Sequence, residues 1–182
     1  DSLAIYDTYD PLANTNDGSC EYPDNGDYSL SFDGVDDYVN VINNSFIPQS
    51  EFSIAMWITT NAIDKQLFGN GNATVPGSYR FLIDIDGQGF YTNMVTNHPD
   101  GGLIEEHVKA DSNVIIADNI PHHICVTYKE GLLKHYLDGI LLKEFVSAGY
   151  SLSSNDIPEN RLGVGINTSR YYQGLIDDFR IW

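Results

Sequence analysis

The feature that most constrains this chain is a long series of short segments in which apolar and polar residues alternate, from Tyr28 to Trp182. In the segment 52–58, the even positions hold Phe, Ile, Met and Ile, whereas the odd positions hold Ser, Ala and Trp. A period of two places one set of side chains on each face of a β-strand, and no comparable stretch repeats with the ~3.6-residue period of a helix. The pattern predicts an all-β fold, an antiparallel β-sandwich of two sheets in a jelly roll.

Twelve such segments are predicted to be strands. They span residues 28–32, 38–42, 52–60, 65–69, 79–85, 89–95, 103–109, 122–128, 132–137, 140–146, 161–165 and 175–182. Asp86, Glu130 and Asp138 are each followed by glycine, which predicts tight hairpins because glycine adopts positive φ at little steric cost. The segments 52–60 and 122–128 have apolar residues on both faces, so we expect them at the centre of a sheet.

The charge balance limits the partners that the chain can bind. Lysine and arginine together number 9 against 26 acidic residues, and the formal net charge is -17. Nucleic acids and anionic membranes both require basic side chains that neutralise phosphates, so we expect no nucleic-acid partner. We also expect no membrane insertion, because no run approaches the ~20 consecutive apolar residues of a membrane-spanning helix.

The beginning of the chain differs from the remainder. Residues 1–27 are rich in Asp, Asn and Gly and show no sustained alternation, so we predict an irregular acidic lead-in before a sandwich domain over residues 28–182. The segment 10–22 resembles the end of a Cys-bounded, Asp-rich repeat of the thrombospondin type 3 kind. In that pattern a second cysteine precedes Asp1, and it would be the partner of Cys20. The alternative is an ordinary acidic linker.

Four blocks of the sequence resemble laminin-G-like, concanavalin A-like domains. The segment 28–39 is similar to the opening motif SLSFDGxDDYV, and the segment 52–58 is similar to the strand FTISAWV. The third block, 122–128 with 136–139, resembles HHVAVTYD and LYVDG, and 174–182 resembles GLIDDVRIY. The blocks occur in the family's order, so the resemblance implies a concanavalin A-like jelly roll over residues 28–182.

The resemblance implies binding rather than catalysis. Such domains are commonly calcium-containing jelly rolls that recognise carbohydrates, glycoconjugates or proteins. We therefore expect a secreted or cell-surface, calcium-binding lectin module of a larger adhesin, with a carbohydrate or glycoprotein surface as its partner. The alternative is a structural domain that assembles a surface filament or fibre through contacts with other chains. An accessory module or catalytic domain of a glycoside hydrolase ranks below both.

Acidic residues in the first and last segments form the candidate metal site. The first and last strands commonly pair in such folds. This pairing would bring the carboxylates of Asp33, Asp36 and Asp37 near those of Asp177 and Asp178. Carboxylates this close repel one another unless a cation neutralises them, and Ca²⁺ takes six to eight oxygen ligands. The predicted calcium ligands are Asp33, Gly34, Asp36, Asp177 and Asp178. The alternative is that the aspartates cap turns and that Arg180 pairs with one of them.

The last segment leaves open which aspartate points inward. Simple alternation places Asp177 on the apolar side, together with Leu175, Phe179 and Ile181. An unpaired buried carboxylate costs several kcal/mol, so either a cation lies beside it or a bulge turns it outward. A bulge would exchange Asp177 for Asp178.

A ligand-binding surface is predicted in three loop regions, 69–80, 91–100 and 167–172. Sugar rings present an apolar face and a rim of hydroxyls, so they are bound by aromatic side chains beside amides, carboxylates and guanidinium groups. The candidate residues are Arg170, Tyr171, Tyr172, Asn93, His98 and Asp100. The sequons at Asn43, Asn72 and Asn167 would indicate glycosylation only in a eukaryotic secretory host.

The sequence offers little for catalysis. Glycosidases need two carboxylates on facing positions, but Glu105 and Glu106 are adjacent and would lie on opposite faces of a strand. The histidines show no zinc-type spacing with glutamate, and no serine lies in a nucleophile elbow. We therefore predict that the chain is not an enzyme.

Overall fold

The structure is a computed structural model that describes residues 29–41, 50–71, 79–87, 89–110, 114–149, 151–152, 159–165 and 170–182. These residues form strands and no helix, so none of them belongs to a helix that could cross a membrane. The lead-in 1–27 with Cys20, and the sequons at Asn43, Asn72 and Asn167, lie outside the described residues.

Thirteen strands make up the described fold. They are β1 (Leu30–Asp33), β2 (Val39–Val41), β3 (Glu51–Thr59), β4 (Lys65–Gly71), β5 (Tyr79–Asp86), β6 (Gly89–Asn97), β7 (Leu103–Lys109), β8 (His122–Lys129), β9 (Leu132–Leu137), β10 (Ile140–Val146), β11 (Ser151–Leu152), β12 (Glu159–Leu162) and β13 (Gln173–Ile181). The two-residue strand β11 was not predicted, because two residues are too few to show alternation.

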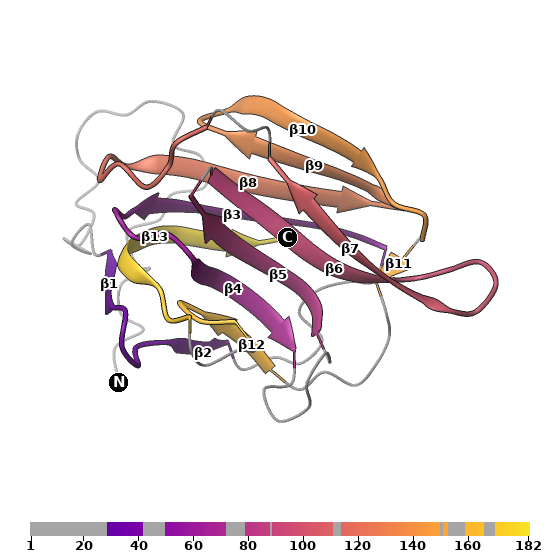
Figure 1. Cartoon of the computed structure of the whole chain (residues 1–182), viewed down its shortest axis with the longest axis horizontal. Helices are drawn as coiled ribbons and strands as arrows, with labels where there is room; N and C mark the ends of the chain where they lie inside the picture. The colour runs from indigo at the N-terminus through magenta and orange to yellow at the C-terminus, as the bar shows by residue number, and fades with distance from the viewer. Residues whose placement is uncertain are drawn as a thin grey trace, which may run out of the picture.

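The strands form two antiparallel sheets packed face to face (Figure 1). Sheet A has the order β1-β13-β3-β8-β9-β10. Sheet B has the order β11-β6-β5-β4-β12-β2, with β7 paired to β6, and its strands β4, β5 and β6 lie in front of sheet A in Figure 1. The prediction of an all-β jelly-roll sandwich is confirmed, and β3 and β8 occupy the central positions expected for them.

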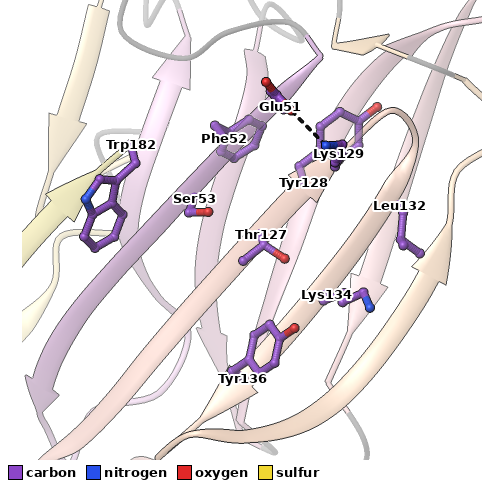
Figure 2. A pocket seen from close by; sticks show the side chains of 10 residues that line it. All are labelled: Glu51, Phe52, Ser53, Thr127, Tyr128, Lys129, Leu132, Lys134, Tyr136 and Trp182. Carbon is purple, nitrogen blue, oxygen red and sulfur yellow. Dashed lines mark ion pairs between the residues drawn. The ribbon is translucent and has the colours of Figure 1, made fainter.

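The alternation of β3 sorts its side chains between the core and the outer face of sheet A. Phe52, Ile54 and Met56 point inward and are at most 4% exposed. The Phe52 ring meets Phe81 of sheet B edge to face, with centroids 5.0 Å apart. Burial of each such side chain contributes about 1.5–3 kcal/mol. The odd positions point outward, and Figure 2 shows Ser53 beside Thr127, its partner on β8.

Two predicted hairpins have the backbone that their sequences require. Glu130 and Gly131 join β8 to β9 with φ angles of 46° and 90°, and Asp138 and Gly139 join β9 to β10 with φ angles of 49° and 81°. Positive φ at both central residues matches the right-handed twist of the flanking strands. The turn sequences therefore fix the β8–β9–β10 meander locally.

A β-bulge in β13 decides the orientation of its acidic residues. The register with β3 shifts between Asp177, which pairs with Trp57, and Arg180, which pairs with Ala55. Asp178 takes up the extra position with φ +48° and is exposed, and Asp177 is only partly buried. The prediction from simple alternation, which placed Asp177 on the apolar side with Leu175, was wrong, because both lie on the outer face of sheet A and Leu175 is 39% exposed. The bulge after Asp177 is what turns Phe179 and Ile181 toward the core.

A histidine lies inside the core between the sheets. His135 of β9 is 0% exposed, packs against Phe90 with ring centroids 5.0 Å apart, and shares a 3.0 Å hydrogen bond between its Nε2 and Thr92 Oγ1. Its Nδ1 has no hydrogen-bond partner in the part of the chain that the structure describes. Burial, followed by the positive charge of Lys143, lowers the pKa of His135 to about 4.

Candidate functional site

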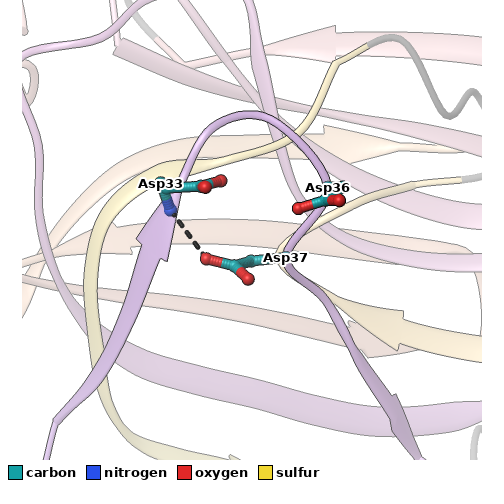
Figure 3. Close-up of side chains that lie close together, drawn as sticks. All are labelled: Asp33, Asp36 and Asp37. Atoms are coloured by element: carbon teal, nitrogen blue, oxygen red, sulfur yellow. Dashed lines mark hydrogen bonds between the residues drawn. The ribbon is translucent and has the colours of Figure 1, made fainter.

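The first candidate site is the acidic turn that leads from β1 in sheet A to β2 in sheet B. Asp33, Asp36 and Asp37 lie around this turn (Figure 3), and one ligand atom from each lies within 4.8 Å of the others. Asp33 Oδ1 accepts a 2.7 Å hydrogen bond from Val35 N, and Asp37 Oδ2 accepts one of 3.0 Å from Asp33 N. The local sequence therefore folds three exposed carboxylates into one cluster.

Glycine is required within this turn. Gly34 has φ +83°, and a Cβ built there would lie 2.9 Å from Gln173 Cβ of the paired strand β13. Such a Cβ would also lie 3.5 Å from Lys65 Nζ, so a cationic side chain of sheet B reaches the turn. The oxygen-rich donor set fits Ca²⁺, whose ligands lie ~2.3–2.6 Å from the ion.

The structure keeps the other two predicted metal ligands away from this cluster. Strands β1 and β13 pair as expected, but Asp33 lies opposite Gln173. Asp177 is four residues farther along β13, or about 13 Å at the rise of a strand. Asp178 Oδ1 instead accepts a 2.7 Å hydrogen bond from Arg180 Nε, which is the alternative pairing considered above. The prediction that Asp177 or Asp178 shares the site of Asp33 was therefore wrong.

The second candidate site is a polar cluster on the outer face of sheet B, centred on Arg170. Its Nη1 lies 3.4 Å from Asp84 Oδ2 and 3.3 Å from Tyr91 Oη, and its Nε donates a 3.1 Å hydrogen bond to the backbone oxygen of Asp64. The guanidinium is thereby held by acceptors from three segments while 27% of the side chain stays exposed. It is a fixed cation that a ligand can reach.

Asp84 is the buried member of this cluster. Its side chain is 1% exposed, and burial raises the pKa of its carboxyl group, although the charge of Arg170 opposes the rise. Asn93 Nδ2 donates a 3.1 Å hydrogen bond to Asp84 Oδ2, whereas Asp84 Oδ1 and Gln66 Oε1 have no such partner in the described ranges. The cluster thus contains buried acceptors whose hydrogen-bonding capacity is incompletely used.

The neighbouring strands β6 and β7 extend the cluster. His107 of β7 donates a hydrogen bond from Nδ1 to Asn93 Oδ1. Lys109 Nζ lies 5.7 Å from the centroid of the Tyr91 ring and 2.8 Å from Asp86 Oδ2. Burial and the adjacent Asp84 raise the pKa of the Tyr91 hydroxyl, so this phenol remains protonated at neutral pH. The face therefore offers donors and acceptors on three adjacent strands.

Close backbone packing brings Arg170 to this face. Gln66 N of β4 donates a 3.0 Å hydrogen bond to the backbone oxygen of Arg170. Nearby, a Cβ on Gly69 would lie 2.6 Å from Gly165 Cα, and a Cβ on Gly165 would lie 2.5 Å from Gln66 Oε1. Side chains at these two glycines would therefore prevent the segment before β13 from lying against β4.

The candidate ligand residues are only partly brought together. Arg170 and Asn93 meet through Asp84, and Tyr171, the residue after Arg170, is partly buried. Tyr172 is 0% exposed, and its hydroxyl donates to Thr59 O at 3.2 Å. The prediction that Tyr172 is an exposed aromatic was wrong, because its ring completes the core.

His98 and Asp100 lie in the turn between β6 and β7, away from the polar cluster. His98 Nδ1 and Asp100 Oδ2 are 3.3 Å apart, and Asp100 N donates to the same nitrogen at 3.2 Å. Asn97, at the end of β6, is four residues from Asn93, or about 14 Å along the strand. These two predicted residues stabilise their own turn and do not contact the Arg170 cluster.

Several residues of the cluster were not predicted as site residues, among them Asp84, Tyr91 and His107. Asp84 falls in the predicted strand 79–85, and Tyr91 falls both in the predicted strand 89–95 and in the predicted ligand-binding region 91–100. A signal was present, since an aspartate alternates with Phe81, Ile83 and Ile85 in a strand that is otherwise buried. A carboxylate in such a strand needs a cation, and the partner Arg170 is distant in sequence.

Comparison with known families gives one match. Residues 33–182 match the family Laminin_G_3, described as the concanavalin A-like lectin/glucanases superfamily. Comparison with curated proteins gives no match.

Solved structures share the fold at low sequence identity. A carbohydrate-binding module, CBM40 of the Ruminococcus gnavus IT-sialidase bound to α2,3-sialyllactose, is 11% identical with a TM-score of 0.66, over 85% of this chain and 89% of that one. Domains LG4-5 of the mouse laminin alpha1 chain are 14% identical with a TM-score of 0.62, over 84% of this chain and 40% of that one.

A third solved structure comes from an arabinanase. Domain 4 of AbnA, an extracellular GH43 arabinanase of Geobacillus stearothermophilus, in complex with arabinotriose, is 14% identical with a TM-score of 0.52. The match covers 83% of this chain and 79% of that domain. At these identities the similarity shows the fold alone.

Proposed function

Because the chain belongs to the Laminin_G_3 family of the concanavalin A-like lectin/glucanases superfamily, we propose that it is a non-catalytic carbohydrate-binding module whose ligand site is the Arg170 cluster. Two solved structures with this fold support the proposal, since their names record α2,3-sialyllactose and arabinotriose as ligands. The ligand class is a glycan end that presents hydroxyl or carboxylate oxygens.

The observation that carries the proposal is the fixed, partly exposed guanidinium of Arg170. A cation held by Asp84, Tyr91 and the Asp64 backbone loses little side-chain freedom when it binds a ligand oxygen. Guanidinium groups bind carboxylates in a bidentate manner and also donate to hydroxyls. The amide of Asn93 and the phenol of Tyr91 add donors and acceptors beside it.

Isothermal titration calorimetry with two probes, α2,3-sialyllactose and arabinotriose, tests the site. We expect at least one probe to bind, and we expect Tyr91→Phe and Arg170→Met to weaken that binding about tenfold or more, since each removes a polar contact of the cluster. Arg180→Met is the matched control, because Arg180 lies on the other sheet. Equal binding by all three variants, with circular dichroism confirming folding, would contradict the proposed site.

We further propose that the acidic turn binds calcium through the carboxylates of Asp33, Asp36 and Asp37, with backbone carbonyl oxygens near Gly34 completing the shell. The clustering of three exposed carboxylates supports this proposal. Bound there, calcium would neutralise the turn and stabilise the connection between the two sheets. It would supply charge and rigidity to the module and no chemical step.

We also propose an extracellular context, as one module of a larger secreted or surface protein. The chain spans 40% of the laminin fragment that shares its fold, and the arabinanase whose domain it resembles is named as extracellular. A rival function, assembly of a surface fibre through protein contacts, is favoured by the edge strand β10, where Ile140 and Val146 are 66% and 74% exposed. Competition of surface binding by free sugar distinguishes the two.

A further inference from the structure

The outer face of sheet A, on the opposite side of the molecule from the Arg170 cluster, has two hollows along strand β3. The first lies near the start of β3 and has a volume of about 630 Å³. The second lies near the end of β3 and has a volume of about 280 Å³. Neither contains a residue of the Arg170 cluster or of the acidic turn.

The first hollow combines aromatic rings with hydroxyl groups. Trp182 is hydrogen-bonded to Ser53 in both directions at 3.0 Å, which fixes its backbone beside β3, and 62% of the residue is exposed. Figure 2 shows Ser53 and Thr127 between Trp182 and Tyr136. Stacking on an indole ring and hydrogen bonds to hydroxyls are the two contacts that a sugar ring needs.

The second hollow repeats this chemistry. Trp57 is 42% exposed, and its ring lies 5.3 Å from that of His123, its neighbour on β8. Thr59 and the partly buried Asp177, which pairs with Trp57 on the outer face, line the same hollow. A second aromatic ring therefore lies beside a hydroxyl and a carboxylate.

Between the two hollows, the outward side chains of β3 and β8 are small and project little from the sheet. Ala55 faces outward between Ser53 and Trp57, and its partner on β8 is Cys125. The flanking partners are longer, Arg180 on β13 and Tyr136 on β9. Small side chains flanked by longer ones therefore lie between the two hollows, and we call this stretch of the outer face, from Ser53 to Trp57 with both hollows, the groove.

The length of this groove exceeds one sugar ring. Trp182 lies beside Ser53. Ser53 and Trp57 are four residues apart on β3, which corresponds to about 14 Å. A ligand that contacts both indoles must therefore be an extended chain of several rings.

Apart from the carboxylate of Asp177 in the second hollow, the charged side chains of the groove lie in ion pairs. Lys134 Nζ lies 2.9 Å from Glu144, Lys129 Nζ lies 3.4 Å from Glu51, and Arg180 is paired with Asp178. Paired charges neither attract an acidic glycan nor bind phosphate strongly. This balance differs from the Arg170 cluster and favours an uncharged ligand.

We propose that the outer face of sheet A is a second carbohydrate site, which binds a neutral linear oligosaccharide along β3 with its rings stacked on Trp57 and Trp182. A protein partner would need a continuous apolar patch to bind firmly, whereas this groove alternates aromatic rings with Ser53, Thr127 and Thr59. The site goes beyond the proposed function because it shares no residue with the Arg170 cluster.

The chain offers a direct readout, because Trp57 and Trp182 are its only two tryptophans. Tryptophan fluorescence and the two indole N–H signals in NMR spectra therefore report on this face alone. The probes are neutral oligosaccharides of six residues, namely arabinohexaose, xylohexaose, cellohexaose and mannohexaose. We expect at least one to shift both indole signals with a single dissociation constant.

Variants then locate the site. Trp57→Ala and Trp182→Ala should each weaken that binding about tenfold, since each removes one stacking contact. Ile140→Ala, an exposed apolar residue of the same sheet outside the groove, and Tyr91→Phe of the Arg170 cluster should leave it unchanged. If a tryptophan variant does not fold, Thr127→Lys blocks the groove without removing a ring and should abolish binding.

Each other outcome overturns the proposal. If no neutral probe shifts the indole signals of the folded protein, the groove is not a carbohydrate site, whatever the calorimetry shows for the Arg170 cluster. If binding is weakened by Tyr91→Phe and not by Trp182→Ala, the neutral glycan uses sheet B. If the indole signals change only with protein concentration, and sedimentation shows a dimer, a second copy of the chain covers the groove.

Discussion

The two outer faces of the sandwich differ in how their polar groups are held. On sheet B, Arg170, Asp84, Tyr91 and Asn93 contact one another, and Asp84 and Asn93 are buried. On sheet A, the two tryptophans of the groove are exposed, Ser53 and Thr127 are partly buried, and ion pairs of Lys129 and Lys134 line the first hollow. A residue of sheet B therefore serves both the stability of the fold and the site, whereas a residue of sheet A can serve a ligand alone.

This difference teaches that the two faces should respond differently to the same kind of substitution. Breaking a buried, interlocked pair leaves a desolvated charge behind, but breaking an exposed pair leaves both groups in water. A substitution on sheet B should therefore change both the free energy of unfolding and the affinity for a ligand. A substitution on sheet A should be able to change the affinity alone.

The largest expected effect concerns the core that both faces share. The pKa of His135 is about 4 in the folded chain, below its ordinary value of 6.5, so the neutral ring stabilises the fold above pH ~6.5. This contribution is lost as the pH falls from ~6.5 towards 4, and it amounts to about 3 kcal/mol. Urea denaturation at pH 7 and pH 4 measures this loss of stability. Each variant of either face must therefore be compared with the unaltered protein at the same pH.

His135→Gln should remove most of this pH dependence, because an amide does not gain a proton in this range. His98→Gln, a substitution in the turn between β6 and β7, is the control and should keep the slope of the unaltered protein. Parallel loss of stability by the unaltered protein and His135→Gln would show that His135 does not have a lowered pKa.

Calcium should stabilise a region that belongs to neither face. If the acidic turn binds calcium, a concentration of about 100 times the dissociation constant should raise the free energy of unfolding by ~2.7 kcal/mol, since only the folded turn gathers the ligands. Thermal melts with calcium and with a chelator measure the effect. Asp36→Asn should abolish it, Asp100→Asn should not, and an unmoved midpoint would refute the calcium site.

Arg170→Met should produce the largest single-residue difference between the faces. It leaves the carboxylate of Asp84 buried without its counter-charge. We expect a loss of about 2 kcal/mol at pH 7, below the ~3–5 kcal/mol of fully buried pairs, because Arg170 is partly exposed. The matched variant on sheet A, Lys134→Met, breaks an exposed pair and should cost much less. Equal losses in urea denaturation would remove the distinction between the faces.

Acid should reduce the cost of Arg170→Met. The pKa of Asp84 is already raised by burial, and loss of Arg170 would raise it further, so Asp84 takes up a proton at a higher pH. A raised pKa favours the folded state at low pH and this contribution is lost as the pH rises. The variant should therefore be closer in stability to the unaltered protein at pH 5 than at pH 7.

The smallest expected effect compares two hydroxyl deletions. Tyr91→Phe removes an acceptor of the Arg170 guanidinium and should cost about 1 kcal/mol of unfolding free energy. Thr127→Val on sheet A keeps the shape of the side chain and removes a hydroxyl from the open groove, so stability should change by less than half as much. A larger loss for Thr127→Val would show that the groove is also interlocked.

The sequence predicted the strands well because their signals are local. The alternation of β3 and the glycine after Glu130 and Asp138 each act within a few residues, and the structure follows them. The family resemblance likewise rests on short blocks, and it correctly identified the sandwich. None of these signals requires knowledge of which strands become neighbours.

The sites were harder to predict because they depend on distant contacts. The bulge in β13 shifts the register with β3 after Asp177, and the close approach of Gly69 and Gly165 brings Arg170 to sheet B. Tyr172, a predicted ligand residue beside Arg170, instead packs against Phe32 with ring centroids 5.8 Å apart. Alternation alone contains no information about these contacts.

The position of β13 between β1 and β3 has a consequence for the order in which the chain can fold. In sheet A, Leu30 pairs with Ile176, and Ile58 pairs with the same residue, so both early strands need a partner from the far end of the sequence. Pairing across such separations closes large loops and slows folding. During synthesis, β3 would have β8 on one side and an unpaired edge on the other until β13 emerges, and such edges invite aggregation. We therefore expect the nascent chain to depend on chaperones until its last strand is made.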